Sequence, residues 1–184
     1  MSTLHTLTRR FFKSNGLLQS LLLVFAVVSL ASCAADKNDP FYFDVEAQKV
    51  RDEAAIRKYF RDNNIDTLAV QRSESGLYFL NVIEGEGAKI EAGDSVSVHY
   101  VGKYLSNIIF DSSYSRAKLL NFVVEKNAVI DGMVEGIQKM NVGGEAILFI
   151  PSHLAYGPFG GGSVPGNTVL IFNLEAISKK PGKK

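Results

Sequence analysis

The sequence has 184 residues, of which 46% are hydrophobic and 21% charged, a composition typical of one globular domain with additional segments. Its formal net charge is +1, and the expected loss of a leader containing Arg9, Arg10 and Lys13 would leave a slight acidic excess. This balance excludes the basic surface that nucleic-acid binding requires. Cys33 is the single cysteine, so an intramolecular disulfide is excluded too.

Residues 1–32 have the layout of a secretory signal peptide. A polar and basic stretch over residues 1–16 precedes an almost unbroken apolar run over residues 17–30, which is short for a membrane span. The join Leu30-Ala31-Ser32-Cys33 resembles the bacterial lipoprotein processing box. That resemblance implies cleavage before Cys33 and a lipid anchor on it, held by burial of acyl chains. An ordinary signal peptide with a chance cysteine, or an uncleaved anchor, is the alternative.

Residues 33–44 are expected to form a short polar tether. Ala34 and Ala35 stand where an aspartate would resemble an inner-membrane retention signal. We therefore expect a lipid-anchored protein of the cell envelope, on the periplasmic side of the outer membrane if the cell is Gram-negative.

The next segment, residues 45–66, has a helical pattern. Val50, Ala54 and residues 56–60 supply an apolar side, and charged residues such as Asp52 and Glu53 supply the opposite side. Asn63-Asn64 predicts the end of the helix. The helix is expected to pack on its own domain in a monomer, with dimerisation through this segment as the alternative.

After Gly76 the hydrophobic period changes to two, which predicts strands. The expected strands cover residues 77–83, 96–100, 119–124, 145–150 and 168–177. One further helix is expected over residues 130–139, where Ile130, Met133 and Ile137 share a face. This order predicts an α+β fold in which a mostly antiparallel sheet wraps around one short helix. The basic residues 179–184 are expected to form a solvated tail.

Several kinds of catalytic site are absent from the sequence. His5, His99 and His153 are scattered without metal-ligand spacing, and no Gly-x-Ser-x-Gly elbow occurs. The glycine run at residues 160–162 lacks the Lys-Ser/Thr pair of a phosphate loop. We therefore expect no metal, no cofactor and no covalent nucleophile.

The remaining motifs follow one another over residues 76–178. They are Val98-His99-Tyr100-Val101-Gly102, Phe110-Asp111-Ser112-Ser113, Val129-Ile130-Asp131-Gly132, Met140-Asn141-Val142-Gly143-Gly144, Ile150-Pro151-Ser152-His153-Leu154-Ala155-Tyr156-Gly157, Val164-Pro165-Gly166-Asn167 and Leu170-Ile171-Phe172. Each piece alone is a weak signal. Together, their order and spacing resemble the FKBP family of peptidyl-prolyl cis-trans isomerases.

The resemblance implies an FKBP-like half-barrel sheet curled around the short helix, with a shallow apolar pocket between them. It implies that the pocket binds proline-containing polypeptides and isomerises X-Pro bonds. The residues that it implies as catalytic are Tyr100, Phe110, Asp111, Tyr156 and Phe172. The residues that it implies as substrate-binding are Arg116, Leu120, Val129, Ile130, Met133 and Val164.

The sequence departs from the family pattern at two positions. Met133 stands at the pocket floor, where the family often has tryptophan, and Leu120 stands at a rim position that is often aromatic. Methionine is flexible and fills irregular space, so we expect a softer floor that still binds a proline ring. Affinity for large macrolides such as rapamycin, and the peptide preference, stay open.

Residue type alone would fit a different interpretation. Tyr100, Phe110 and Phe172 could be ordinary core aromatics, Tyr156 a packing anchor and Asp111 a turn former. Only the ordered match favours a catalytic site. The leading hypothesis is an active prolyl isomerase for exported proteins, and the alternative is a non-catalytic FKBP-like chaperone or binding module in an envelope assembly.

Overall fold

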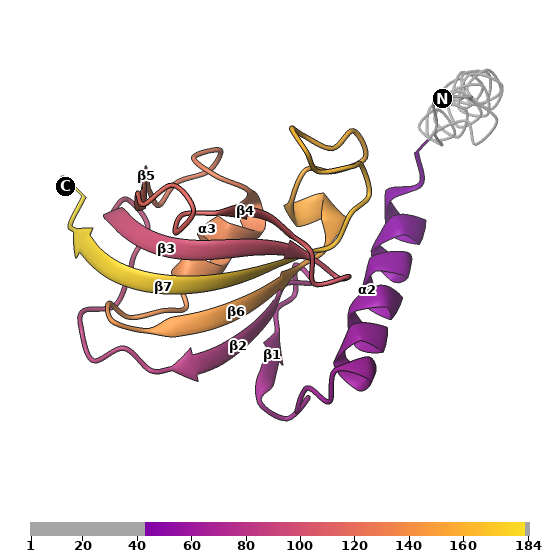
Figure 1. The fold of residues 1–184 in the computed structure, drawn as a ribbon, viewed down its shortest axis with the longest axis horizontal. Helices are drawn as coiled ribbons and strands as arrows, with labels where there is room; N and C mark the ends of the chain where they lie inside the picture. Colours follow the sequence, from indigo (N-terminus) through magenta and orange to yellow (C-terminus); the bar gives the residue numbers. More distant parts are fainter. Residues whose placement is uncertain (1–42, 183–184) are drawn as a thin grey trace, which may run out of the picture. The chain divides into compact units, whose positions relative to one another are not determined.

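Helix α2 (Val45–Asp62) begins the part of the chain that the computed structural model describes, residues 43–182 (Figure 1). Asp44 caps its start, because its Oδ1 accepts a hydrogen bond from the Ala47 backbone N–H at 2.9 Å. The helix ends at Asn63, as the sequence predicts, and Asn64 follows with a φ of 53°. The predicted signal peptide, the lipidated Cys33 and nearly all of the tether lie outside the described residues.

The buried side of α2 differs from the predicted apolar side. Gln48, Asp52, Ile56 and Phe60 are buried, at a spacing of four residues. Val50 is 70% exposed, so the prediction is wrong in the first half of the helix. Ile56 and Phe60 pack on the helix's own sheet. There the Phe60 ring meets that of Phe149 edge-on, with centroids 4.7 Å apart.

Seven strands within residues 43–182 form a single antiparallel sheet. They are β1 (Val70–Arg72), β2 (Tyr78–Ile83), β3 (Ser95–Tyr104), β4 (Ile109–Ser112), β5 (Leu120–Val123), β6 (Glu145–Ile150) and β7 (Leu170–Lys180). Their order is β1-β2-β6-β7-β3-β4, and β5 also pairs with β3. The sequence patterns miss β1 and β4, which are only three and four residues long. The predicted basic tail is also wrong at its start, because Lys179 and Lys180 belong to β7.

Helix α3 (Asp131–Ile137) lies close against one face of this sheet. A Cβ atom on Gly132 would come within 2.4 Å of Ile150 Cγ2, and one on Gly136 within 2.3 Å of Leu148 Cδ1. Only glycine at these two positions allows so close an approach. Alternate residues of β6 therefore face two different partners: Leu148 and Ile150 pack under α3, whereas Phe149 packs under α2.

The predicted α+β architecture, an antiparallel sheet around one short helix with a preceding helix, is confirmed. A short 3₁₀ helix, η1 (Ser152–Leu154), links β6 to the long loop before β7. None of the helices within residues 43–182 has both the length and the apolar character needed to cross a membrane.

The C-terminal strand is fixed by a buried ion pair. Lys179 Nζ lies 2.8 Å from Asp94 Oδ2, and the two side chains are only 14% and 5% exposed. Backbone N–H groups of Glu91 and Gly182 also donate to the Asp94 carboxylate. The bond from Lys179 is the main cause that lowers the pKa of Asp94. This pairing explains why Lys179 is part of the sheet and not of a solvated tail.

Candidate active site

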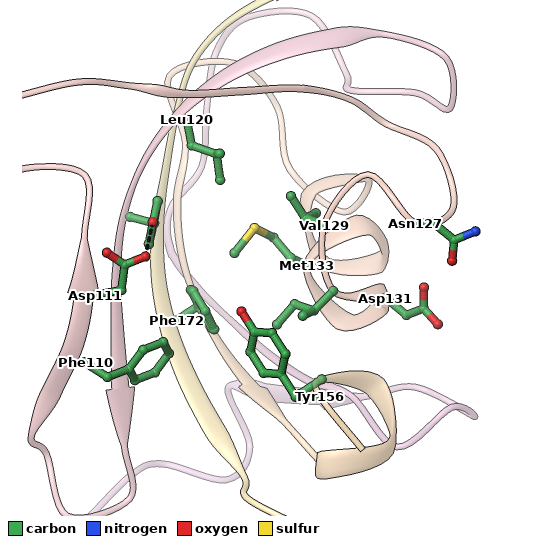
Figure 2. Close-up of a pocket in the computed structure, with 12 residues that line it drawn as sticks. Phe110, Asp111, Leu120, Asn127, Val129, Asp131, Met133, Tyr156 and Phe172 are labelled. Atoms are coloured by element: carbon green, nitrogen blue, oxygen red, sulfur yellow. Dashed lines mark hydrogen bonds between the residues drawn. The ribbon is translucent and has the colours of Figure 1, made fainter. Parts of the chain in front are cut away.

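A cavity of about 520 Å³ opens between α3 and the sheet (Figure 2). Its lining comes from β3, β4, β5 and β7, from α3 and the segment before it, and from the turn after η1. The lining residues are Tyr100, Phe110, Asp111, Leu120, Asn127, Val129, Ile130, Asp131, Met133, Ala155, Tyr156 and Phe172. Most of them are apolar or aromatic, which suits a small apolar ring better than an ion.

The aromatic wall of the cavity comes from β4 and β7. The rings of Phe110 and Phe172 meet edge-on, with centroids 5.7 Å apart and an interplanar angle of 81°. Gly102 of β3 lies beneath Phe110, since a Cβ there would come within 2.7 Å of the ring. Met133 is 3% exposed, and its thioether points from α3 into the cavity. A ligand ring would therefore meet a stiff aromatic wall and a flexible methionine floor.

The polar edge of the cavity is a closed network around Asp111. Its carboxylate accepts hydrogen bonds from the Tyr100 hydroxyl, from Arg116 and, at 2.8 Å, from the Ser112 backbone N–H. Arg116 also donates to the Tyr100 hydroxyl, and its guanidinium carbon lies 5.7 Å from the centre of the Tyr100 ring. Each polar group is thus held by the other members of the network.

This network fixes the protonation of its members. Burial raises the pKa of Asp111, but the hydrogen bonds from Tyr100 and Arg116 together outweigh it, so the pKa is lowered overall. Burial, followed by the bond to Asp111, raises the pKa of Tyr100. At neutral pH the carboxylate is charged and the phenol keeps its proton. Neither group is therefore suited to act as a general base or acid.

Several hydrogen-bond donors at the cavity have no partner among the described residues, and two of them could bind a peptide. The Tyr156 hydroxyl, on a side chain that is 40% exposed, points into the cavity from the turn after η1 (Figure 2). Its ring packs against Gly161, where a Cβ would come within 2.6 Å of the ring. The Ile130 backbone N–H donates to no other described residue. Both groups are available to bind carbonyl oxygens of a peptide.

The structure brings nine of the eleven predicted site residues together as cavity lining, all except Arg116 and Val164. Arg116 contacts the polar edge from outside through Asp111 and Tyr100. Val164 is 5% exposed and packs in the buried cluster that also contains Tyr100, Met133 and Phe172, so its role in substrate binding stays a prediction. Reciprocal backbone hydrogen bonds of 2.9 Å between Gly161 and Val164 close the loop and leave its side chain buried.

Three lining residues, Asn127, Asp131 and Ala155, were not among the predicted site residues. Asp131 and Ala155 stand inside motifs that the sequence analysis used, so their neighbours could have indicated them. Asn127 had no such signal; it adopts a φ of 67°, and its side chain points away from the apolar lining (Figure 2). Within residues 43–182, no group of three or more His, Cys, Asp or Glu side chains could hold a metal ion.

An antiparallel sheet around a short helix, with a largely apolar cavity between them, is the arrangement that the resemblance of the motifs implied. The sequence model of the FKBP-type peptidyl-prolyl cis-trans isomerases matches residues 86–177. The chain therefore belongs to the FKBP-type peptidyl-prolyl cis-trans isomerase family.

Relatives from bacteria agree with this assignment. The chain is 44% identical over 113 residues to the FKBP-type peptidyl-prolyl cis-trans isomerase FkpA of Aeromonas hydrophila, covering 61% of this chain and 41% of that protein. It is 38% identical over 134 residues to the FKBP-type 22 kDa peptidyl-prolyl cis-trans isomerase of Escherichia coli, covering 72% and 64%. The chain thus spans less than two thirds of either curated relative.

A solved structure shows the same fold. The crystal structure of FkpA from Escherichia coli matches with a TM-score of 0.63 at 29% identity, over 94% of this chain and 76% of that one. The likeness extends beyond the family's matched residues.

Proposed function

We propose that the protein is a peptidyl-prolyl cis-trans isomerase that acts on X-Pro bonds in proline-containing polypeptides. The observation that carries the proposal is the cavity itself, a largely apolar hollow in which the Tyr156 hydroxyl and the Ile130 backbone N–H have no partner among the described residues. Membership of the FKBP-type family supports the same conclusion.

The chemistry suits such a cavity. Rotation about an X-Pro bond is opposed by amide resonance, with a barrier of about 18–20 kcal/mol, and no covalent bond needs to break. The twisted amide is less polar across C–N than the planar one, so an apolar cavity binds it better. Each tenfold gain in rate requires about 1.4 kcal/mol of this preference. A few dry contacts and hydrogen bonds are therefore sufficient without an acid, a base or a cofactor.

The lining residues have four different roles in this proposal. Phe110 and Phe172 hold the proline ring, and Tyr156 donates to a neighbouring carbonyl. Tyr100 and Asp111 keep the polar edge fixed beside the ring. Leu120, Val129, Ile130 and Met133 bind the substrate, whereas Arg116 acts only through the polar edge.

A peptide assay tests the proposal directly. The full-length chain should accelerate cis-trans exchange in short X-Pro peptides, measured by exchange NMR or a protease-coupled assay. A rate no faster than that in buffer contradicts the proposal. Tyr156→Phe should lower kcat/KM about tenfold with an unchanged melting temperature, because its hydroxyl lies at the cavity without a partner among the described residues. If this variant unfolds instead, Tyr156 is structural.

A second candidate function is binding of polypeptides without catalysis. Ile108, Ile109 and Phe159 are 63%, 57% and 96% exposed, so apolar side chains are available on the surface to contact unfolded chains. The same experiment separates the two functions. Peptide binding without rate acceleration favours the binding module.

We also propose an envelope location through a lipid on Cys33, on the periplasmic side of the outer membrane in a Gram-negative cell. The support is the sequence before Cys33, the sole cysteine of the chain. A monomer is the proposed state, since the Ile56 and Phe60 side of α2 is buried on its own sheet. Loss of membrane association in Cys33→Ser tests the anchor, and sedimentation tests the monomer.

A further inference from the structure

A buried carboxylate joins helix α2 to the turn that carries Tyr156. Asp52 is 2% exposed, although the sequence pattern predicted it on the solvent side. Its Oδ2 accepts hydrogen bonds from both the backbone N–H and the hydroxyl of Ser152, at 2.8 and 2.6 Å. Its Oδ1 accepts a third bond from Gln48 Nε2 at 2.7 Å. Burial of a carboxylate is costly unless such bonds satisfy it, so the arrangement needs an explanation.

Ser152 is the residue around which the Tyr156 turn is organised. It is 2% exposed and begins η1. Its carbonyl oxygen accepts hydrogen bonds from Ala155 and Gly157, the two residues that flank Tyr156, at 3.0 and 2.9 Å. Fixing Ser152 therefore fixes the backbone on both sides of Tyr156. The Gly157 carbonyl in turn accepts from Asn167 at 2.8 Å, which ties the far end of the loop to the same point.

The carboxylate is held in place from its own helix as well. Arg51 donates two hydrogen bonds to Gln48 Oε1, at 2.9 and 2.7 Å. Because that oxygen is occupied, the amide nitrogen of Gln48 is left to donate to Asp52. A continuous chain of hydrogen bonds thus runs from Arg51 through Gln48 and Asp52 to Ser152, where it ends at the turn.

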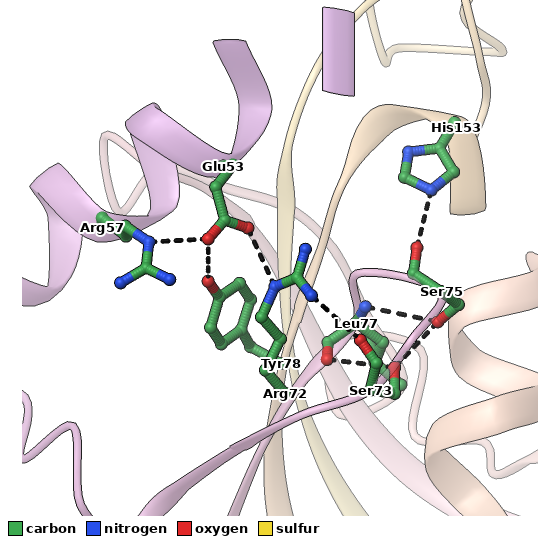
Figure 3. A network of polar contacts seen from close by, with 8 residues as sticks. All are labelled: Glu53, Arg57, Arg72, Ser73, Ser75, Leu77, Tyr78 and His153. Carbon is green, nitrogen blue, oxygen red and sulfur yellow. Dashed lines mark hydrogen bonds and ion pairs between the residues drawn. The ribbon is translucent and has the colours of Figure 1, made fainter. Parts of the chain in front are cut away.

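The need to hold α2 on the sheet does not by itself explain why the Asp52 carboxylate is buried. Glu53, the next residue, accepts hydrogen bonds from Tyr78 at 2.5 Å and Arg72 at 3.1 Å, which join α2 to β2 and β1 (Figure 3). Ile56 and Phe60 add the apolar contact with the sheet. These anchors hold the helix without contact to Ser152. Asp52 is the α2 side chain that bonds to the turn.

We propose that Asp52 is a positioning residue for Tyr156, so that helix α2 is part of the support of the active site. The proposal rests on the isomerase function proposed above. Its content is specific: Asp52 acts on catalysis through Ser152 and the Tyr156 hydroxyl, and its neighbour Glu53 does not.

A double-mutant cycle on the full-length chain tests this route. Asp52→Ala should lower kcat/KM on an X-Pro peptide about tenfold, about 1.4 kcal/mol, at a temperature where the variant is folded. In a Tyr156→Phe background the same change should cost less than about twofold, because the affected hydroxyl is already gone. Asp52→Asn, which keeps one acceptor oxygen, should restore part of the loss. Glu53→Gln should leave kcat/KM unchanged.

Two results would overturn the proposal. One is unchanged activity in folded Asp52→Ala, and the other is an equal loss in both backgrounds. If Asp52→Ala does not fold, Ser152→Ala takes its place in the cycle, since it removes one donor and keeps the backbone N–H. It should lower kcat/KM about threefold, again only when the Tyr156 hydroxyl is present.

A readout without catalysis separates this proposal from the proposed function. The ring signals of Tyr156 and the backbone amide signals of Tyr156 and Gly157 should shift in Asp52→Ala and stay in place in Glu53→Gln. If the wild-type chain shows no isomerase activity, the proposed function fails, and these signals still decide whether Asp52 positions the turn. Unshifted Tyr156 signals in folded Asp52→Ala would contradict the positioning role.

Discussion

Two parts of the molecule contain the same three chemical groups, a carboxylate, a tyrosine hydroxyl and a guanidinium. In one, Asp111 accepts from Tyr100 and Arg116. In the other, Glu53 accepts from Tyr78 and Arg72, with Arg57 as a further donor at 2.6 Å. In both, an arginine guanidinium carbon lies 5.7 Å from the centre of the tyrosine ring. Chemical type alone does not distinguish them.

The cavities beside the two networks do distinguish them. The hollow beside Asp111 is lined by Phe110, Phe172 and other apolar side chains. The hollow beside Glu53, about 440 Å³, is lined by three arginines, Arg57, Arg61 and Arg72, together with Phe60, Thr67, Val70 and Tyr78. A neutral proline ring gains from the first environment and not from the second. The two polar networks are therefore alike, and the hollows beside them differ in the charge of their lining.

The largest expected effects come from removing one aromatic ring in each region and measuring both the stability and the activity of each variant. Phe60→Ala should lower the free energy of unfolding by about 3–5 kcal/mol, because Phe60 is buried between α2 and the sheet, and should change kcat/KM little. Phe110→Ala should lower kcat/KM about 100-fold, about 2.7 kcal/mol, with a smaller loss of stability. Denaturant titration and the peptide assay measure both. If Phe60→Ala lost mainly activity and Phe110→Ala lost mainly stability, the assignment of the active site to the Phe110 region would be wrong.

The carboxylates give a smaller contrast. Asp111→Asn should lower kcat/KM about tenfold, since the charge that holds Tyr100 and Arg116 beside the cavity is lost. Glu53→Gln is the matched control and should cost only about 1 kcal/mol of stability, with activity retained. Equal activity losses in the two variants would argue against a special role for the Asp111 network.

The pH dependence of stability should be the smallest effect. Burial raises the pKa of Glu53, but hydrogen bonds from Tyr78, Arg57 and Arg72 outweigh it and lower the pKa, as at Asp111. Free Asp and Glu titrate near pH ~3.9 and ~4.3, so between these values and the lowered ones the unfolded chain binds more protons. Stability should therefore fall as the pH drops from about 5 to 3, by about 1 kcal/mol or less per network.

Melting temperatures across this pH range measure the effect. The decline should be shallower in Asp111→Asn and in Glu53→Gln than in the wild type. Parallel curves for all three proteins would mean that neither carboxylate has the lowered pKa on which the expectation rests.

The sequence allowed most of the sheet and the pocket to be predicted, because strand periodicity and ordered motifs are local signals. It did not reveal β1 or β4, because three and four residues are too few to show an alternating pattern. It also placed Asp52 in solvent, since an amphipathic pattern treats every charge as exposed. The burial of Asp52 depends on Ser152, one hundred residues away, and no local pattern contains that information.

The pairing of β3 with β7 sets the order in which the molecule becomes functional. The two strands pair from Ser95 with Lys180 to Tyr104 with Leu170, so the last strand of the sheet pairs with one that lies far earlier in the chain. Phe172, one wall of the cavity, arrives on β7, so the cavity is incomplete until the last strand closes. Such long-range closure is slow compared with helix formation. A chain that leaves the ribosome or crosses a membrane N-terminus first therefore gains its binding surface only after nearly all of it has emerged.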